Sequence, residues 1–167
     1  MLKKLFVPGL VVAFVLGVVA GRNHLFLPVA EATTTSPANG WTLHIDAEKH
    51  FGDANPTEIA HHWCKPVSGG LTECQIYDSD APDARLVEVE TIVTPAVYKT
   101  FSPQEQALWH YHKVEIPKVN AKLPDMTPDQ AAKTLAAISD TYGKVWMLWD
   151  PAANPNPVGS PAVVVLK

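Results

Sequence analysis

Two short motifs gather the side chains best suited to chemistry. Four of the seven histidines lie in His61-His62-Trp63-Cys64 and Trp109-His110-Tyr111-His112. Together with Cys74, these side chains are borderline-soft ligands suited to Zn²⁺ or another divalent transition metal. Their spacing matches no established zinc signature. The sequence therefore supports two interpretations: a metal site that uses His61, His62, His110 and His112, or a hydrogen-bonded polar layer that includes Trp63, Trp109 and Glu115.

Whether the histidines of one motif act together depends on the local backbone. On a strand, residues two apart share a face, so His62 would lie beside Cys64 and His110 beside His112. If a helix that begins at Ser102 continued through His112, the two histidines of the second motif would point about 200° apart. Both alternatives are open from the sequence.

The two cysteines have three interpretations. In an exported domain, Cys64 and Cys74 most often form a disulfide. A hairpin with Ser68-Gly69-Gly70 as its loop would place them directly opposite each other, which is close enough for that bond. Metal ligation and two buried thiols are the alternatives.

Acidic side chains offer candidate acids or bases, but no enzyme class. Glu88, Glu90 and Glu115 could move protons, although a carboxylate on a strand is usually on a solvated face. The chain contains no G-x-S-x-G, H-E-x-x-H, C-x-x-C, P-loop or dinucleotide-binding motif. Catalytic residues are therefore not assigned.

Several short segments are typical of strands. Residues 58–67 and 71–78 flank the Ser-Gly-Gly loop as a hairpin, and residues 85–93 alternate with period 2 and are rich in β-branched side chains. In residues 144–149, the run Val145-Trp146-Met147-Leu148-Trp149 is apolar without alternation, which favours a central strand. Residues 150–161 contain four prolines and should form a loop, before a last strand at 162–166.

Two segments carry clear helix starts. Ser102-Pro103-Gln104-Glu105 and Thr127-Pro128-Asp129-Gln130 each place a capping hydroxyl before proline and a capping-box residue. After the second start, one face is apolar through Ala131, Leu135, Ile138 and Tyr142. This pattern predicts one long helix from about Pro128 to Tyr142, with Gly143 as its C-cap. The expected fold is α+β: a single domain with an antiparallel sheet, one long helix and short helices.

Composition agrees with one globular domain and excludes some partners. The chain has 167 residues, of which 47% are hydrophobic and 18% charged. Its formal net charge is −4 and its basic residues form no dense block, so we expect no nucleic-acid partner. The oligomeric state is not indicated.

The first 32 residues are typical of a targeting segment. Lys3 and Lys4 precede 17 uncharged residues at positions 5–21, and Ala30-Glu31-Ala32 fits a signal-peptidase site. We expect residues 1–32 to be a signal peptide or N-terminal anchor, residues 33–42 a linker and residues 43–167 the domain. The domain is then periplasmic or extracellular, with membrane contact through residues 5–21 if they are retained.

The same motifs carry a family resemblance over roughly residues 43–165. The segments that carry it are residues 58–64, 73–79, 84–98, Trp109-His110-Tyr111-His112 and Tyr142-Gly143-Lys144 through Trp149. In these segments the chain resembles the oil body-associated proteins, whose domain is the DUF1264 domain of unknown function. The resemblance implies association with lipid droplets in plants and supplies no catalytic residues. Met147 departs from the Tyr-Gly-Lys-x-x-His-x-Trp pattern of plant members, which leaves that position without a metal or acid–base role.

These observations favour a small exported, non-catalytic binding or envelope-associated module for a lipid or small molecule. The alternative is a metal-dependent enzyme that uses the four histidines and a nearby glutamate as base. Convergence of both histidine motifs on one pocket would favour the enzyme, and separation by a filled core would favour the binding module.

Overall fold

The computed structural model describes residues 37–49 and 58–165. The expected targeting segment, residues 1–32, lies outside this part of the chain. Among the residues described, no helix is both long enough and apolar enough to cross a membrane.

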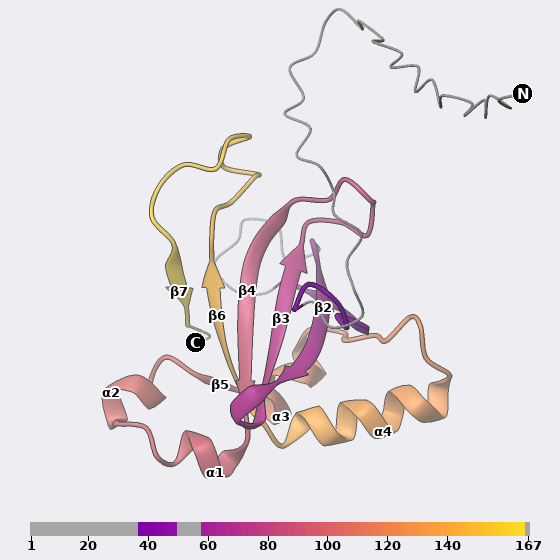
Figure 1. The fold of residues 1–167 in the computed structure, drawn as a ribbon, viewed down its shortest axis with the longest axis vertical. Helices are drawn as coiled ribbons and strands as arrows, with labels where there is room; N and C mark the ends of the chain where they lie inside the picture. The colour runs from indigo at the N-terminus through magenta and orange to yellow at the C-terminus, as the bar shows by residue number, and fades with distance from the viewer. Residues whose placement is uncertain (1–36, 50–57, 166–167) are drawn as a thin grey trace, which may run out of the picture. The chain divides into compact units, whose positions relative to one another are not determined.

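An antiparallel sheet forms the body of the domain (Figure 1). Its strands are β1 (Leu43–Glu48), β2 (Ile59–Val67), β3 (Leu71–Tyr77), β4 (Leu86–Val93), β5 (His110–Tyr111), β6 (Tyr142–Met147) and β7 (Ala162–Val164). The strand order is β1-β2-β3-β4-β6, and both β5 and β7 pair with the free side of β6. The expected sheet is confirmed, while strand β1 was not predicted.

The β2–β3 hairpin has the register that the sequence predicts. Cys64 pairs with Cys74, and His62 with Ile76. The loop is the short 3-10 turn η1 (Ser68–Gly70), in which Gly69 and Gly70 adopt φ of 78° and 72°. These left-handed conformations favour glycine, because a Cβ atom is strained there. The Ser-Gly-Gly loop therefore sets which residues of the two strands face each other.

The helices are short and gather toward one end of the sheet (Figure 1). They are α1 (Pro95–Tyr98), α2 (Pro103–Gln106), α3 (His112–Glu115) and α4 (Pro128–Ser139), with a 3-10 turn η2 (Ile116–Lys118). Ser102 and Thr127 cap α2 and α4 as predicted. The prediction of one long helix to Tyr142 is wrong. The α4 helix ends at Ser139 because Tyr142 and Gly143 pair with β4 and β5, so Gly143 is a strand residue rather than a C-cap.

One face of the sheet, here called the inner face, carries the core. The core residues are Ala60, Cys64, Cys74, Ile76, Ile92 and Val145, with Leu43, Ile45 and Val164 packed against them. Residues of α3, η2 and α4 cover part of this face. Glu88 and Glu90 also point inward and are buried, so the expectation that these strand carboxylates are solvated is wrong. Glu88 is 3.6 Å from the buried Lys49 ammonium, which offsets its charge.

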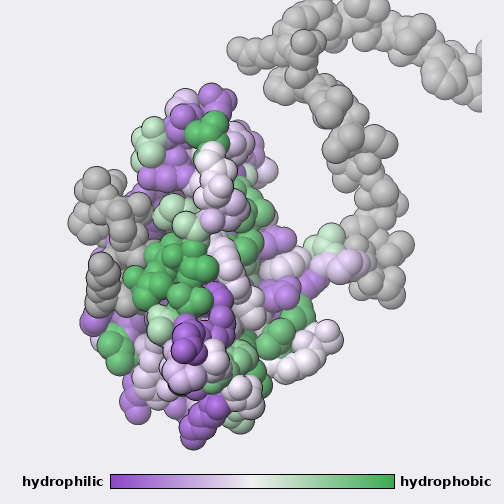
Figure 2. Space-filling view, turned by 90° about the vertical axis from the view of Figure 1, so that its left-hand side faces the viewer, coloured by the Kyte–Doolittle hydropathy of each residue, from purple (hydrophilic) through white to green (hydrophobic). Residues whose placement is uncertain are grey.

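The β6 edge is closed partly by β7. Figure 2 looks at this side of the molecule and shows apolar side chains gathered on part of it. Val164 of β7 packs against the core, so this short strand extends the apolar interior beyond β6.

Candidate metal centre

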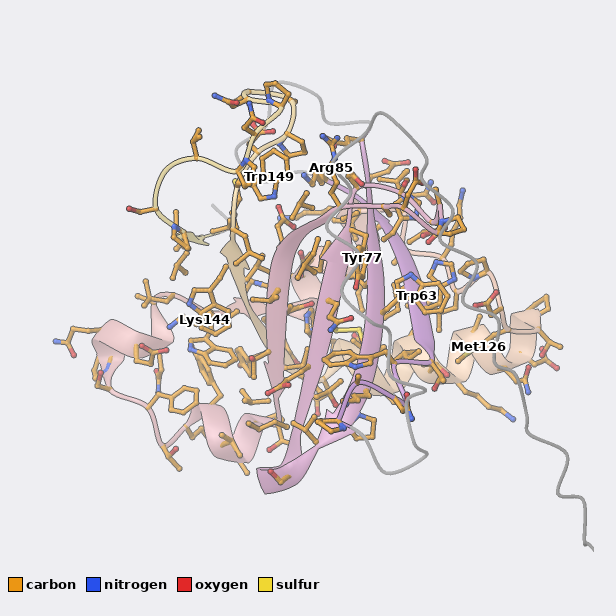
Figure 3. The ribbon with its side chains drawn as sticks, turned by 45° about the horizontal axis from the view of Figure 1, so that its top comes forward. Trp63, Tyr77, Arg85, Met126, Lys144 and Trp149 are labelled. Carbon is orange, nitrogen blue, oxygen red and sulfur yellow. A yellow bond between two sulfur atoms is a disulfide. The ribbon has the colours of Figure 1, made fainter. Side chains whose placement is uncertain are left out.

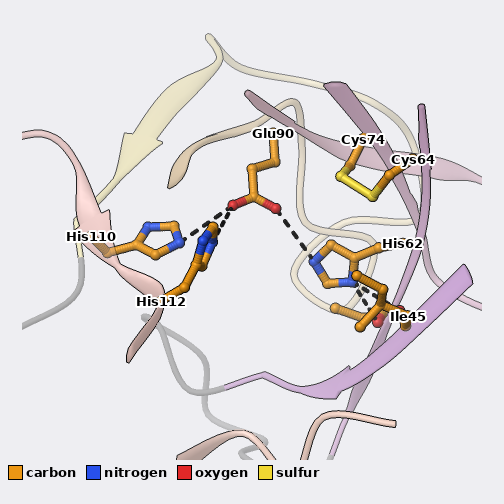
Figure 4. Close-up of a disulfide and its surroundings, with 8 residues drawn as sticks. Ile45, His62, Cys64, Cys74, Glu90, His110 and His112 are labelled. Carbon is orange, nitrogen blue, oxygen red and sulfur yellow. Dashed lines mark hydrogen bonds and ion pairs between the residues drawn. A yellow bond between two sulfur atoms is a disulfide. The ribbon is translucent and has the colours of Figure 1, made fainter. Parts of the chain in front are cut away.

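Three histidines, His62, His110 and His112, surround Glu90 on the inner face (Figure 4). We call His62, Glu90, His110, His112 and Glu115 the inner cluster. Glu90 Oε1 is 3.1 Å from His112 Nε2 and 3.4 Å from His110 Nε2. Glu115 Oε2 is 2.8 Å from His110 Nε2, and His62 Nε2 is 4.0 Å from Glu90 Oε2. Three imidazoles and two carboxylates therefore converge.

The backbone around β5 brings the second histidine motif into this cluster. The α2 helix ends at Gln106, and His110 and Tyr111 are extended and pair with β6. His112 then begins α3, which places Glu115 one turn later. Of the two alternatives from the sequence, the helical one is wrong, and His110 and His112 point to the same glutamate.

Hydrogen bonds fix the ring orientation of two histidines. Nδ1 of His62 donates to the carbonyl oxygens of Ile45 and Ala60, at 3.1 and 3.0 Å. Nδ1 of His112 donates to Thr141 Oγ1 at 2.8 Å, because the Thr141 hydroxyl itself donates to the Ile138 carbonyl. Each Nδ1 thus holds a proton, and each Nε2 faces the cluster. Metal-binding histidines are typically oriented in this way.

The cluster is strongly polarised. Burial raises the pKa of Glu90, but hydrogen bonds from His110 and His112 outweigh burial and hold that pKa well below its usual range. Burial lowers the pKa of His110, but hydrogen bonds to Glu115 and Glu90 raise it to about 10. A proton on His110 therefore balances part of the carboxylate charge.

A small cavity with mostly apolar walls adjoins the cluster. Its volume is about 60 Å³. The lining residues include His62, Glu90, His110, His112 and Glu115, together with Ile45, Ile92, Leu135, Ile138 and Val145. This volume accommodates a few water molecules or a ligand of a few atoms. Convergent polar groups within an apolar cavity are typical of binding sites.

His61, the fourth expected ligand, lies on the other face of the sheet. It is next to His62 on β2, and successive side chains of a strand point to opposite faces. There it contacts Asp46 and Asp80 in a second group, the outer cluster, which consists of His44, Asp46, His61 and Asp80. The structure thus brings together His62, His110 and His112, and places His61 apart from them.

The two tryptophans of the motifs do not lie in the inner cluster. Trp63 stacks on His44 with ring centroids 4.2 Å apart, on the outer face. Trp109 packs on Phe101, and its indole N–H donates to Glu105 Oε1 at 2.8 Å. Among the predicted residues of the polar layer, Glu115 alone belongs to the inner cluster.

Cys64 and Cys74 form a disulfide, as the hairpin register predicts. Both residues are buried in the core beside the inner cluster (Figure 4). Because both sulfurs are in this bond, the ligand atoms available near the cavity are imidazole nitrogens and carboxylate oxygens.

Comparison with known proteins places these motifs in a family. A family model described as a protein of unknown function (DUF1264) matches residues 35–166. The chain belongs to the DUF1264 family. Its curated relatives include Oil body-associated protein 2C of Arabidopsis thaliana, which is 32% identical over 77% of this chain and 55% of its own length. Oil body-associated protein 2B of Zea mays is 35% identical over 63% of this chain and 42% of its own length.

The DUF1264 chain described here spans about half the length of the curated relatives it matches. No solved structure matches it. The family match confirms the resemblance that the motifs carry.

Sequence reasoning missed Glu90 as the centre of the inner cluster and missed His44, Asp46 and Asp80 altogether. A register argument could have found Glu90, because it pairs with Cys74 and Val145 on the core side of the sheet. His44 and Asp46 are two apart on β1, a spacing that places both on one face. Asp80 follows β3 in a turn, and no local pattern marks it.

Proposed function

We propose that this domain is a binding module for a divalent transition-metal ion and that the inner cluster holds the ion. The observation that carries the proposal is the convergence of His110 Nε2, His112 Nε2 and a Glu90 oxygen within 4.8 Å of one another in a buried site. Two imidazoles and one carboxylate are a common ligand set for such ions.

The distances between donor atoms support shared coordination. Two ligand atoms about 2.1 Å from one metal, at angles of 90–110°, are about 3.0–3.4 Å apart. The distances from Glu90 Oε1 to the two Nε2 atoms, 3.1 and 3.4 Å, fall in this range. Glu115 Oε2, which is 2.8 Å from His110 Nε2 and 3.9 Å from His112 Nε2, supplies a fourth ligand.

The ligand chemistry favours certain ions. Imidazole suits Zn²⁺, Fe²⁺, Ni²⁺ and Cu²⁺, and the added carboxylates admit Mn²⁺. Mg²⁺ and Ca²⁺ prefer sites made of oxygen ligands, so this nitrogen-rich site should discriminate against them. Zinc is the practical first probe.

Titration of the whole chain with zinc tests the proposal, and calorimetry measures the zinc affinity. Glu90→Gln removes the central negative charge with little change of shape, and the affinity of the inner site should fall by more than the 10–100-fold typical of an outer partner. Thr141→Val removes the oxygen that accepts from His112 Nδ1 and should weaken binding by about 10–100-fold.

Thr134→Val is the matched control for the threonine variant, because Thr134 lies on α4 and bonds to Met126 rather than to a cluster residue. It should leave zinc affinity unchanged. Melting temperatures of all variants identify any that do not fold. If folded Glu90→Gln and Thr141→Val bind zinc at every site as tightly as the unmodified chain, the inner cluster is not a metal site.

A second candidate function is metal-dependent catalysis. The convergence of His62 from the first motif with His110 and His112 from the second on one cavity favours it. Structural zinc sites are closed by four protein ligands, whereas catalytic sites leave a position for water or substrate. The cobalt-loaded protein tests this distinction. A change of its visible spectrum on adding azide is expected for an open position, and an unchanged spectrum would indicate a closed, non-catalytic site.

The relatives are named oil body-associated proteins, so lipid is a further candidate partner of this domain. The cavity is small, about 60 Å³, and its walls are mostly apolar. We propose that any lipid association of this domain uses its surface rather than this small cavity. Flotation with neutral phospholipid vesicles tests this: protein in the vesicle fraction supports surface association, and protein left in the aqueous fraction contradicts it.

We infer that the domain functions outside the cytoplasm. The Cys64–Cys74 disulfide supports an oxidising compartment, because cytoplasmic thiols are kept reduced. If residues 1–32 are a cleaved signal peptide, the intact mass should correspond to a chain that begins at Thr33. A full-length chain in the membrane fraction would indicate an anchor, and a cytoplasmic chain with two free thiols would contradict export.

A further inference from the structure

The outer cluster joins two strands and the turn after β3 on the face of the sheet opposite the inner cluster. His44 and Asp46 come from β1, His61 from β2 and Asp80 from the turn. One donor atom from each of these four residues lies within 4.8 Å of the others. We propose that the outer cluster is a second site for a divalent transition-metal ion, independent of the inner one.

The strand register creates this cluster. His61 pairs with Asp46, and His44 pairs with Trp63 on the adjacent position of the same face. Trp63 stacks flat on the His44 ring, at an interplanar angle of 10°, and holds the ring in place. Figure 3 shows Trp63 and Tyr77 on neighbouring strands; Tyr77 directly precedes the segment that returns Asp80 to the cluster.

The orientation of His44 points to a cation. Its Nδ1 donates to Asp125 Oδ2 at 3.0 Å, and since an ionised carboxylate only accepts, the Nδ1 proton is fixed. Its Nε2 is buried and has no hydrogen-bond partner among the described residues. Asp46 Oδ1 and Asp80 Oδ1 nevertheless lie 3.2 and 3.1 Å from this nitrogen. The two oxygens therefore flank the Nε2 atom without a hydrogen bond, an arrangement suited to an ion that all three atoms share.

His61 completes a four-ligand set. Its Nδ1 is hydrogen-bonded to Asp46 Oδ1 at 2.8 Å and lies 2.9 Å from Asp80 Oδ2. Donor atoms that share one ion at about 2.1 Å and right angles are about 3.0 Å apart. The four separations are close to this value, and they fit a common ion that Asp80 holds through both carboxylate oxygens. The two carboxylates of this set carry a charge of −2, which a divalent cation balances.

The burial of the four residues suggests an exchangeable site. His44 is only 6% exposed, while the Asp80 side chain is 38% exposed. The ion would therefore reach the cluster from the Asp80 side. Because two of the four donors are nitrogens, the site should prefer Zn²⁺ over Ca²⁺.

Zinc stoichiometry of the full chain, measured by calorimetry, tests the proposal. The unmodified protein should bind two equivalents. Asp80→Asn and His61→Gln should each weaken one of them at least tenfold, and excess Ca²⁺ should displace neither. Asp83→Asn is the matched control, since Asp83 is an exposed aspartate of the same turn outside the cluster. It should bind two equivalents with unchanged affinity.

The variants separate this site from the inner one. Glu90→Gln should weaken only the equivalent that Asp80→Asn leaves intact. If the unmodified protein binds a single equivalent that Asp80→Asn weakens and Glu90→Gln leaves unchanged, the outer site stands and the proposed function fails. If folded Asp80→Asn and His61→Gln bind as the control does, the outer site is wrong.

Discussion

Glu90 Oε1 occupies the space that a side chain on residue 143 would need. A Cβ atom added to Gly143 would approach both this oxygen and His110 Nε2 more closely than real Cβ atoms approach any heavy atom. Gly143 lies in the middle of the β4–β6–β5 arrangement, opposite Ile92 and His110. The absence of a side chain there allows β6 to lie directly beside the inner cluster.

Gly143→Ala should therefore disturb the inner cluster. Forcing a methyl group into a packed site typically costs about 1–3 kcal/mol of unfolding free energy, and the Glu90 side chain must shift. We expect this loss in urea melts and a loss of at least tenfold in zinc affinity at the inner site. Equal stability and equal zinc affinity would show that the approach is not as close as described.

The disulfide should stabilise the domain without contributing to metal binding. It closes a loop between residues 10 positions apart, for which chain entropy predicts about 3 kcal/mol. The Cys64→Ala, Cys74→Ala double variant should lose at least this much in denaturant melts and keep its zinc stoichiometry. Loss of a zinc equivalent from a folded double variant would return the sulfurs to the ligand set.

The apolar face of α4 should show a moderate effect. Leu135 lines the cavity but is only half-buried, so Leu135→Ala should cost about 1–2 kcal/mol, below the 2–5 kcal/mol typical of a fully buried leucine. Lys133 is exposed, and Lys133→Ala should change stability by less than about 0.5 kcal/mol. Denaturant melts compare the two variants; equal effects would contradict the assigned face.

The Asp78–Arg85 pair predicts a pH-dependent contribution to stability. Burial raises the pKa of Asp78, but hydrogen bonds from the Arg85 backbone N–H and guanidinium, the latter at 2.6 Å, lower it below its ordinary value. A group with a lowered folded-state pKa stabilises the fold above its unfolded pKa, and this contribution is lost as the pH falls through the folded value. Arg85 also lies over the Trp149 ring, at 5.4 Å (Figure 3).

Asp78→Asn should therefore lower the unfolding free energy by about 0.2–1 kcal/mol at pH 7, because Arg85 is half exposed and the pair is screened. The difference from the unmodified chain should persist to about pH 4 and shrink below it. Urea melts across this range measure the difference, with Asp83→Asn as the control for removal of one surface charge. A difference that grows as the pH falls would contradict the lowered pKa.

Local patterns were enough to predict several of the elements and the pairing within the hairpin. The Ser68-Gly69-Gly70 loop dictates the β2–β3 register, and that register places Cys64 against Cys74. Serine and threonine caps before proline locate the starts of α2 and α4. Such signals act over a few residues, so they can be recognised without knowing the rest of the fold.

The composition of the two clusters was decided by tertiary structure. His61 and His62 are neighbours in sequence, but strand alternation sends them to opposite faces, and each finds partners from elements far along the chain. Glu90 meets His110 and His112 only because β6 lies between β4 and β5 and carries no side chain at Gly143. Long-range pairing also ends the α4 helix early, because the pairing of Tyr142 and Gly143 with β4 and β5 outweighs the local helical pattern. The residue types determined which side chains of this protein can bind a metal. Long-range strand pairing decided which of those side chains lie together.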